Sequence, residues 1–327
     1  MNIEKKLLVV ILTWNDYENT IKCLESARNI QEKNIFFLLI DNNSKDKSIA
    51  KIRKKFEFQD IRNIKYSNLK SNFLFIKNPT NLGCGAGQNT GYEFAIKNDF
   101  KYIARIDNDM EFGKNFFKDN LKVLDQNTSI QALSPKILYY FNPKKIWWMG
   151  CKIGNSLKLQ THMRDYSYHL DDNPKYSGLK KTDAIAGCAS IMRTSRLKEV
   201  GLSDIDFFYG PEDVEFSNRI KFEKNDNSLI VNLDSVIYHK VTQSFNANLT
   251  YRRIYFEYKY RLLLIKKIGT INDKIFGYTI SILKHLGYCM LFFRNNHRKK
   301  IRPVGSAIVD FFFFNRLGNF DRKNNSN

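Results

Sequence analysis

The chain has 327 residues, of which 43% are hydrophobic, and a formal net charge of +20 at pH 7. A chain of this length and composition can bury a sizeable core, so global disorder is excluded. The charge is uneven, because residues 251–327 hold 16 Lys or Arg against 4 Asp or Glu. A basic tail of this kind attracts a polyanion, either anionic lipid head groups or nucleic acid.

The amino terminus and the cysteines are not those of a secreted protein. Residues 1–6 run directly into an apolar segment with no small-residue cleavage pattern. The five cysteines contain no C-x-x-C pair, which supports neither a disulfide framework nor a zinc site. We therefore expect the catalytic part to stay in the cytoplasm.

Apolar runs of strand length alternate with helical patterns in the first third of the chain. The helical pattern at 17–27 is expected to begin at Asn15 as its N-cap, with Glu18 three residues on. Continuous apolar runs are typical of strands buried on both faces of a parallel sheet. The alternation predicts an α/β domain with a mainly parallel sheet. The four runs are Leu7–Thr13, Ile35–Ile40, Phe73–Ile76 and Tyr102–Ile106.

Beyond residue 130 the pattern is looser. Further strands are predicted at 130–138, 184–192 and 229–238, and an extended loop region at 142–180. Aromatic and histidine side chains of this loop region could line an acceptor pocket, although aromatic residues in loops more often pack against the domain. They are Trp147, Trp148, His162, Tyr166, Tyr168 and His169.

The tail begins with a predicted basic amphipathic helix at 251–268. Two apolar stretches follow at 275–283 and 286–293, each shorter than the roughly 18–20 residues that a spanning helix needs. We expect them to lie in the interface of an anionic membrane, with the basic residues at the head groups. Packing against the core or a dimer partner is the alternative, and the oligomeric state is open. No nucleic-acid-binding motif accompanies the charge, so a nucleic-acid partner is not expected.

Polar side chains follow several of the predicted strands. Thr13, Asp41 and Asp107 stand at carboxyl ends of strands, where parallel sheets bind ligands, so they predict one cleft. Asp107 and Asp109 form a D-x-D tripeptide. Carboxylate oxygens suit Mg²⁺ or Mn²⁺, and a cation held by one or two carboxylates keeps positions open for phosphate oxygens.

The order of these motifs resembles the family 2 glycosyltransferases of the GT-A fold, in particular the rhamnosyl- and galactofuranosyl-transferase-like branch. The likeness covers about residues 7–245. It implies a GT-A catalytic domain at 1–250, a basic, aromatic helical tail at 251–327, and Mn²⁺ or Mg²⁺ as cofactor. It also implies a nucleotide-sugar donor, UDP- or dTDP-linked. The motifs that carry it are Asp41–Asp46, Asn81–Gly91, Asp107–Asp109, Gly187, Glu212–Asp213 and His239.

The resemblance also assigns roles to residues. Asp213 would be the catalytic base, and Glu212 would position the acceptor. Gly187 would lie beside the donor sugar. The metal would be held by Asp109, Asp107 and His239. The donor nucleotide would be bound by Thr13, Asn15, Asp41, Asn81, Gly83, Gly87, Asn89 and Asp107.

Elementary chemistry agrees with these roles. A nucleoside diphosphate leaves more readily when its charge is neutralised, which a cation on Asp109 would do. One base and one direct displacement invert the anomeric carbon. Arg105, where relatives mostly have an apolar residue, would lower the pKa of a neighbouring carboxylate if it faces the cleft.

The resulting hypothesis is an inverting, metal-dependent hexosyl- or deoxyhexosyl-transferase of cell-surface polysaccharide or glycoconjugate synthesis. It would act on a glycan or lipid-linked acceptor, peripheral on the inner face of the cytoplasmic membrane. A sugar nucleotidyltransferase is one alternative, but it would need a basic Gly-rich loop where residues 13–16 stand. A non-catalytic polyanion-binding protein is another, and it leaves the carboxylates without a role.

Overall fold

The structure, a computed structural model, describes residues 6–61, 69–153, 163–164, 170–221, 228–241, 251–294 and 301–313, with the backbone alone at 163–164 and 251–253. Four side chains predicted as acceptor-pocket candidates lie outside the described residues. They are His162, Tyr166, Tyr168 and His169.

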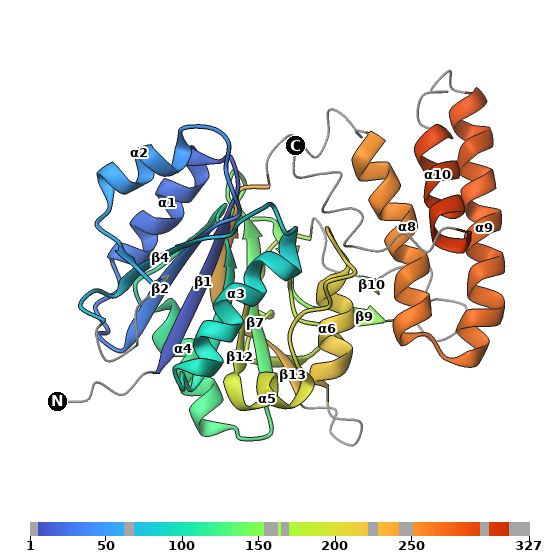
Figure 1. Ribbon diagram of the computed structural model, residues 1–327. Coiled ribbons are helices and arrows are strands. Elements are labelled where there is room, and N and C mark those ends of the chain that lie inside the picture. Colours follow the sequence, from blue (N-terminus) through green and yellow to red (C-terminus); the bar gives the residue numbers. More distant parts are fainter. Residues whose placement is uncertain are drawn as a thin grey trace.

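Eleven strands form one central sheet (Figure 1). They are β1 (Leu7–Thr13), β2 (Ile35–Asp41), β3 (Gln59–Asp60), β4 (Phe73–Lys77), β5 (Tyr102–Asp107), β6 (Met110–Phe112), β7 (Ala132–Tyr139), β8 (Ile146–Trp148), β11 (Leu179–Lys181), β12 (Ala189–Arg193) and β13 (Leu229–His239). The order is β11-β13-β7-β12-β5-β1-β2-β4-β3, with β6 paired to β13 and β8 to β7. β9 (Lys152–Ile153) and β10 (Met163–Arg164) pair separately. The region predicted as a loop, 142–180, thus contributes short strands.

The sheet is mixed and mostly parallel, which confirms the predicted α/β class. β5, β1, β2, β4 and β3 are parallel neighbours. β12 is antiparallel to both β5 and β7. This antiparallel strand separates the parallel half of the sheet, which contains β1 to β5, from β7 and β13, which again run parallel to each other.

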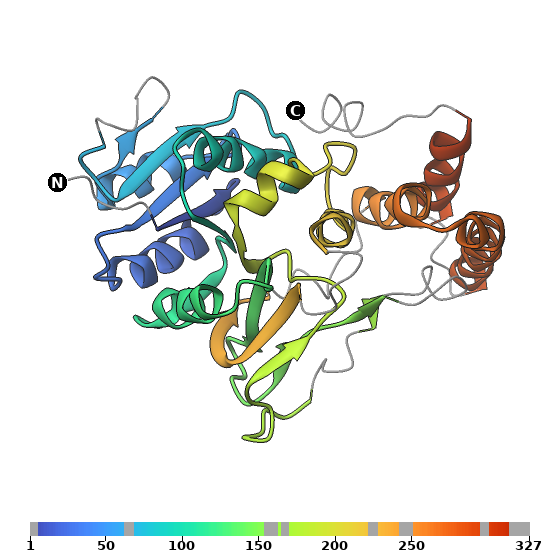
Figure 2. The ribbon, with the colours of Figure 1, turned by 90° about the horizontal axis from the view of Figure 1, so that it is seen from below.

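Helices cover both faces of the sheet (Figures 1 and 2). Side chains of α1 (Tyr17–Arg28), α2 (Ser48–Lys55) and α4 (Phe116–Gln126) join the core on one face. Those of α3 (Cys84–Lys97), α5 (Thr194–Val200) and α6 (Glu212–Ile220) join the core on the other. The layers are helix, sheet, helix.

β1 shows how the sequence produces these layers. Leu7, Val9 and Ile11 lie in the core on the α1 side, whereas Leu8 and Val10 lie in the core on the α3 side. Successive side chains of a strand point to opposite faces, so only an uninterrupted apolar run suits a strand covered on both sides.

Strand register brings the predicted site residues to one edge of the sheet. Thr13 pairs with Asp41 across β1 and β2, and Leu12 pairs with Asp107 across β1 and β5. On the other side of β5, the antiparallel pairing of β6 with β13 sets Met110 opposite His239. The segment between β5 and β6, which contains Asp109, therefore lies next to His239.

The tail forms a helical layer beside the domain (Figure 2). It comprises α8 (Tyr251–Ile268), α9 (Ile271–Arg294) and α10 (Ile301–Phe312). α8 contacts α6 of the domain as well as α9 and α10. Apolar side chains of α8 and α10 share a buried cluster with Phe207, Phe208 and Val214 of the domain. The tail is thus packed through α8 onto the domain that contains the central sheet.

α9 corrects one sequence prediction. The two short apolar stretches are parts of one 24-residue helix that continues through Lys284 and His285. His285 is buried, with its ring edge against Tyr258, and burial lowers its pKa to about 4. His285 is therefore neutral and faces α8, so it does not break the helix. Of the described helices, α9 is the one long and apolar enough to cross a membrane, judged by length and composition.

Candidate active site

A cavity of about 380 Å³ lies at the carboxyl ends of β1 and β5. Its volume is in the range of small-molecule sites, roughly 300–1,000 Å³. Four side chains or backbones that the sequence predicted to bind the donor nucleotide line its wall, namely Thr13, Asn81, Gly83 and Asp107. The predicted cleft at this edge of the sheet is therefore present.

Gly83 can only be glycine. Its φ of +82° is in the region that favours glycine, and a Cβ there would lie 2.2 Å from the carbonyl oxygen of Phe208. The next residue, Cys84, donates its backbone N–H to the same carbonyl at 2.9 Å. The glycine thus lets the start of α3 touch the loop at 203–211 that leads to α6.

Asn42 holds this part of the wall together. Its amide nitrogen donates to Asn81 Oδ1 at 2.9 Å and to the carbonyl of Gly83 at 3.1 Å. Its amide oxygen accepts from Asn78 at 3.0 Å. Asn42 also lines the cavity, although the sequence singled out its neighbour Asp41.

Two predicted nucleotide-binding residues lie behind the wall instead of on it. The Asp41 side chain is fully buried; its Oδ1 accepts from the Ser44 N–H at 2.8 Å, and Lys77 lies 3.5 Å from its Oδ2. Asn15 also turns away, because its φ is +53° and its Oδ1 accepts from the backbone N–H of Lys45 at 2.8 Å. Both residues shape the 41–46 loop in this structure and do not face the cavity.

The N-cap of α1 is also displaced from the prediction. Asp16, not Asn15, caps the helix and accepts from the Asn19 N–H at 3.2 Å. Asp16 lies between the end of β1 and the start of α1, and it lines the cavity. Its second oxygen accepts from Asn108 at 3.0 Å, which ties α1 to the turn after β5.

Gly87 and Asn89 likewise support the cavity from inside α3. A Cβ on Gly87 would meet Leu12 at 3.0 Å, so the glycine lets α3 approach β1 closely. The Asn89 side chain is bonded twice to Ser203, donating to its carbonyl at 2.9 Å and accepting from its N–H at 3.0 Å. Two residues of α3, Cys84 and Gln88, line the cavity, and the buried amide nitrogen of Gln88 has no hydrogen-bond partner among the described residues.

Asp109 and His239 are brought together by the β6–β13 pairing. Asp109 Oδ2 lies 3.1 Å from His239 Nε2, and both side chains are largely buried. The ring of Trp147 stands edge-on to the imidazole with centroids 4.5 Å apart. Trp147 thus packs against a predicted metal ligand, whereas Trp148 belongs to the hydrophobic core.

A buried ion pair stands behind the cavity. Arg105 Nη2 donates to Glu212 Oε1 at 2.9 Å, and its Nε lies 3.9 Å from Asp107 Oδ1. Arg105 does not line the cavity, but it lies beside two of the predicted site carboxylates and opposes the rise in the pKa of Asp107. Glu212 is only 3% exposed and anchors the first turn of α6; its role in positioning the acceptor stays a prediction.

Asp213, next to Glu212, points toward Gly187. Its Oδ2 accepts from the Gly187 N–H at 3.1 Å, and its Oδ1 accepts from the Val214 N–H at 2.9 Å. A Cβ on Gly187 would lie 2.8 Å from the same Oδ2. The small residue predicted beside the donor sugar is therefore required here by the carboxylate of Asp213.

The two carboxyl groups on this edge have raised pKa values. Burial, with the adjacent charge of Glu212, raises the pKa of Asp213 to about 6, against the opposing charge of Arg105. Partial burial also raises the pKa of Asp107 to about 6, again opposed by Arg105. A carboxylate with a pKa in this range can take up a proton near neutral pH.

Residues 8–199, more than half of the chain, match the family described as glycosyl transferase family 2. The chain belongs to this family. An uncharacterized glycosyltransferase of Methanocaldococcus jannaschii is 30% identical over 148 residues, which are 42% of this chain. The chain spans about half, 46%, of the length of that relative. Membership supports the transferase class over the nucleotidyltransferase and polyanion-binding alternatives; the predicted branch within the family stays a prediction.

Solved structures agree on the fold. A structure of GalNAc-T7 with UDP, GalNAc and Mn²⁺ is similar with a TM-score of 0.56 and 14% identity, over 81% of this chain and 48% of that chain. A structure of S. aureus TarS 1-349 in complex with UDP-GlcNAc gives 0.50 and 17%, over 82% and 68%. At such low identities the likeness shows the fold alone, which is GT-A-like as the sequence predicted.

This family 2 chain has aromatic cavity residues that sequence reasoning missed. Trp14 and Tyr209 line the cavity and are 44% and 47% exposed. Phe208 and Phe256 line it as stacked rings, 5.4 Å apart. Trp14 had a usable signal, since it directly follows the strand residue Thr13. Phe256 had none, because it reaches the cavity from α8 of the tail.

Proposed function

We propose that this chain is an inverting, metal-dependent glycosyltransferase that moves a sugar from a nucleotide donor to a hydroxyl group of an acceptor. The observation that carries the proposal is the arrangement of three features around the end of β5, although Asp109, His239 and Asp213 do not themselves line the cavity. These are the cavity, the Asp109–His239 pair and the Asp213 carboxylate with its raised pKa. Family membership supports the transfer chemistry.

The residues present fit a divalent cation. Asp109 offers an oxygen and His239 a nitrogen ligand, and the two atoms are already 3.1 Å apart. Within the described ranges no three His, Cys, Asp or Glu side chains gather in metal-holding geometry, so donor phosphates and water would complete the shell. When bound, Mn²⁺ or Mg²⁺ would neutralise charge on the departing diphosphate. Asp107, 3.9 Å from Arg105, is better placed to contact the ribose or a water ligand.

Asp213 would act as the base. Its carboxylate takes the proton of the acceptor hydroxyl, the hydroxyl oxygen forms a bond to the anomeric carbon, and the bond from that carbon to the diphosphate breaks. A single displacement of this kind inverts the anomeric configuration. The Gly187 and Val214 N–H groups fix the carboxylate, and Glu212, held by Arg105, fixes the helix start on which it sits.

The donor is proposed to be a UDP- or dTDP-sugar. UDP is present in the two compared structures, which supports a uridine or thymidine nucleotide. The exposed rings of Trp14 and Tyr209 offer faces for stacking a base. For the acceptor we propose a glycan or lipid-linked glycan, with a hexosyl or deoxyhexosyl group transferred in the cytoplasm at the inner membrane face.

Thermal stability with nucleotides and metal tests this proposal. UDP, dTDP and their sugars would be added to the protein with Mn²⁺ or with EDTA, for wild type, Asp109→Ala and the exposed control Asp119→Ala. A ligand at about 100 times its Kd should stabilise the fold by about 2.7 kcal/mol. We expect wild type and Asp119→Ala to gain this stability with Mn²⁺ only. When an acceptor is supplied, we also expect release of free nucleoside diphosphate.

Two results would count against the proposal. If no nucleotide stabilises the folded protein in any metal condition, the cavity does not bind a donor. If nucleotides stabilise Asp109→Ala as much as wild type, the Asp109–His239 pair is not the metal site.

A further inference from the structure

Exposed apolar side chains are concentrated on the tail. Of the eighteen large hydrophobic residues that are exposed in the described part of the chain, twelve lie between residues 271 and 313. Solvent-exposed apolar residues are common when scattered, but a contiguous patch marks an interaction surface. The remaining six are distributed over the catalytic domain.

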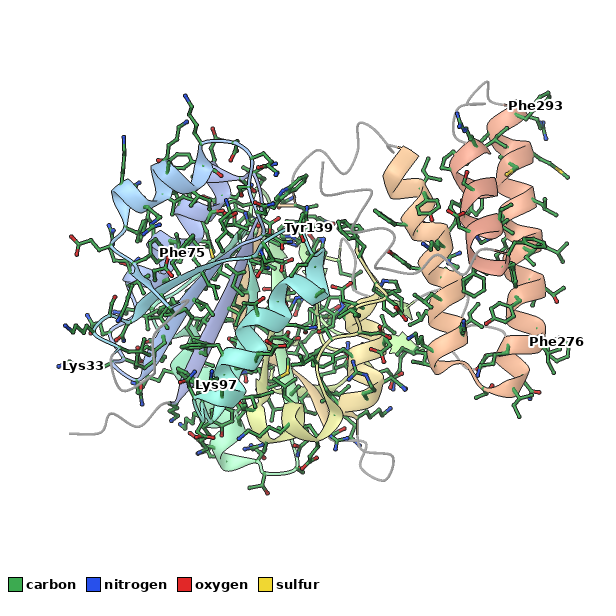
Figure 3. The ribbon with its side chains drawn as sticks, viewed as in Figure 1. Lys33, Phe75, Lys97, Tyr139, Phe276 and Phe293 are labelled. Atoms are coloured by element: carbon green, nitrogen blue, oxygen red, sulfur yellow. The ribbon has the colours of Figure 1, made fainter. Side chains whose placement is uncertain are left out.

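Five of the nine exposed large hydrophobic side chains of α9 form one stripe. Its members recur at spacings of three, four and seven residues, which places them on one face of the helix. Figure 3 shows Phe276 and Phe293, near the two ends of α9, pointing away from the rest of the molecule. The opposite face of α9 is buried at Gly277, Ser281 and His285. The stripe, here called the outer face, consists of Phe276, Leu283, Leu286, Met290 and Phe293, and α10 adds Phe312.

The charges beside the outer face have one sign. Lys274, Arg294 and Arg302 are exposed, whereas Lys284 is half-buried toward α8, where burial and the nearby charge of Arg261 lower its pKa. The two acidic residues among the described parts of 269–313 face inward. Asp273 is buried and accepts from Thr270, and Asp310 accepts from the Tyr255 hydroxyl at 2.7 Å.

We propose that the outer face seats this protein on an anionic phospholipid bilayer, with α9 lying in the plane of the interface. Apolar rings would enter the boundary between head groups and acyl chains, and the lysines and arginines would meet anionic head groups. From Phe276 to Phe293 the outer face is about 25 Å long at 1.5 Å per residue. This seat concerns the same inner-membrane location as the proposed function, but it does not require that the chain transfers a sugar.

Charge decides against a second copy of the chain as the occupant. If two outer faces packed together, the exposed cations beside one face would come close to those beside the other and repel them. An anionic surface would attract them instead. Packing decides against a helix that crosses the bilayer. α9 contacts both α8 and α10, and its inner side carries the buried polar residues Asp273 and His285. If α9 crossed the bilayer, lipid would have to take the place of the α8 and α10 side chains that pack against its inner side.

Vesicle co-sedimentation tests the seat without any nucleotide. The full chain would be mixed with vesicles of phosphatidylcholine, or of phosphatidylcholine with phosphatidylglycerol. The test variant is Leu283→Asp/Met290→Asp. The matched control is Phe141→Asp/Leu179→Asp, which adds the same charges at residues 77% and 47% exposed on the catalytic domain. Circular dichroism confirms that each variant is folded.

We expect wild type and control to bind the anionic vesicles far better than the neutral ones, and the test variant to lose about tenfold in partition coefficient. The seat is overturned if folded wild type stays in the supernatant with anionic vesicles, or if the test and control variants bind equally. Sedimentation velocity adds a further check. A dimer that the test variant dissociates, with vesicle binding unchanged, would assign the outer face to a second copy.

Discussion

At the scale of single residues, Arg105 controls the charge balance of the candidate site. Among the described residues it is the one cation in contact with Glu212 and Asp107, and its charge also opposes the raised pKa of Asp213. Glu212 acts in the opposite direction, because its negative charge favours the protonated form of Asp213. The two partners of one buried ion pair therefore tune the proposed base with opposite signs.

Activity should fall as the pH drops through about 6, where Asp213 becomes protonated and can no longer accept a proton. Arg105→Met removes the charge that favours the carboxylate, so this acid limb should move to higher pH. Glu212→Gln removes the charge that disfavours it, so the limb should move to lower pH. Rates of sugar transfer measured against pH would show both shifts, with the exposed Arg53→Met as the control.

The same pair predicts a stability effect. Removing one partner of a buried ion pair leaves an uncompensated charge, which costs about 3–5 kcal/mol. Arg105→Met should therefore lower the free energy of unfolding by this amount, and Arg105→Met/Glu212→Gln should lower it less.

The pH profiles provide a check on this electrostatic account. It would be contradicted if the acid limbs of Arg105→Met and Glu212→Gln moved in the same direction.

At the scale of elements, α8 forms part of the cavity. Phe256 lines the wall, and the Tyr260 hydroxyl accepts the Phe208 N–H at 3.0 Å. Lys267 lies 2.8 Å from both Asp204 and Asp206 of the loop before α6. This helix, which the sequence assigned to a membrane-binding tail, holds the loop that carries Phe208 and Tyr209 and that leads to Asp213.

Nucleotide affinity should therefore depend on α8. Phe256→Ala removes a stacked ring from the wall, and an aromatic pair is worth about 0.5–1.5 kcal/mol beyond its buried area. Tyr260→Phe leaves the Phe208 N–H unpaired, at a cost of about 1–3 kcal/mol. Calorimetric titration with UDP or dTDP should show weaker binding for both variants and none of this loss for Tyr288→Phe, an exposed tyrosine of α9. Unchanged affinity in Phe256→Ala would remove α8 from the site.

At the scale of the whole molecule, the cluster that joins α8 and α10 to Phe207, Phe208 and Val214 should make the chain unfold as one unit. All three tryptophans lie in the catalytic domain, and nearly half of the residues in described helices lie in the tail. Urea unfolding followed by tryptophan fluorescence and by far-ultraviolet circular dichroism should therefore give coincident transitions.

Leu263→Ala sharpens this test. Leu263 is fully buried in the shared cluster, and such a truncation costs about 2–5 kcal/mol. We expect both transitions to shift together to lower urea. A second circular dichroism transition with no fluorescence change would mean that the tail unfolds by itself.

The sequence alone determined the class of fold, the positions of the main strands along the chain and the edge of the sheet that holds the site. Apolar runs such as Leu7–Thr13 are read directly, because burial on both faces demands them. Thr13, Asn81, Gly83 and Asp107 line the cavity because they belong to motifs that end strands or begin α3, and their role in nucleotide binding stays a prediction. The family followed from the order of these motifs along the chain, which the match over residues 8–199 confirms.

Only the tertiary structure decided which polar groups face the cavity and which hold its wall. Asp41 and Asn89 are spent on hydrogen bonds to nearby or distant backbone, while Asn42 and Gln88 beside them reach the cavity. Neighbours in a sequence differ in direction by the turn of a loop or helix, and contacts such as that of Phe256 bring together residues far apart in the chain. Local pattern specifies how a segment buries its apolar face; the direction of each polar side chain depends on partners that only the folded chain brings near.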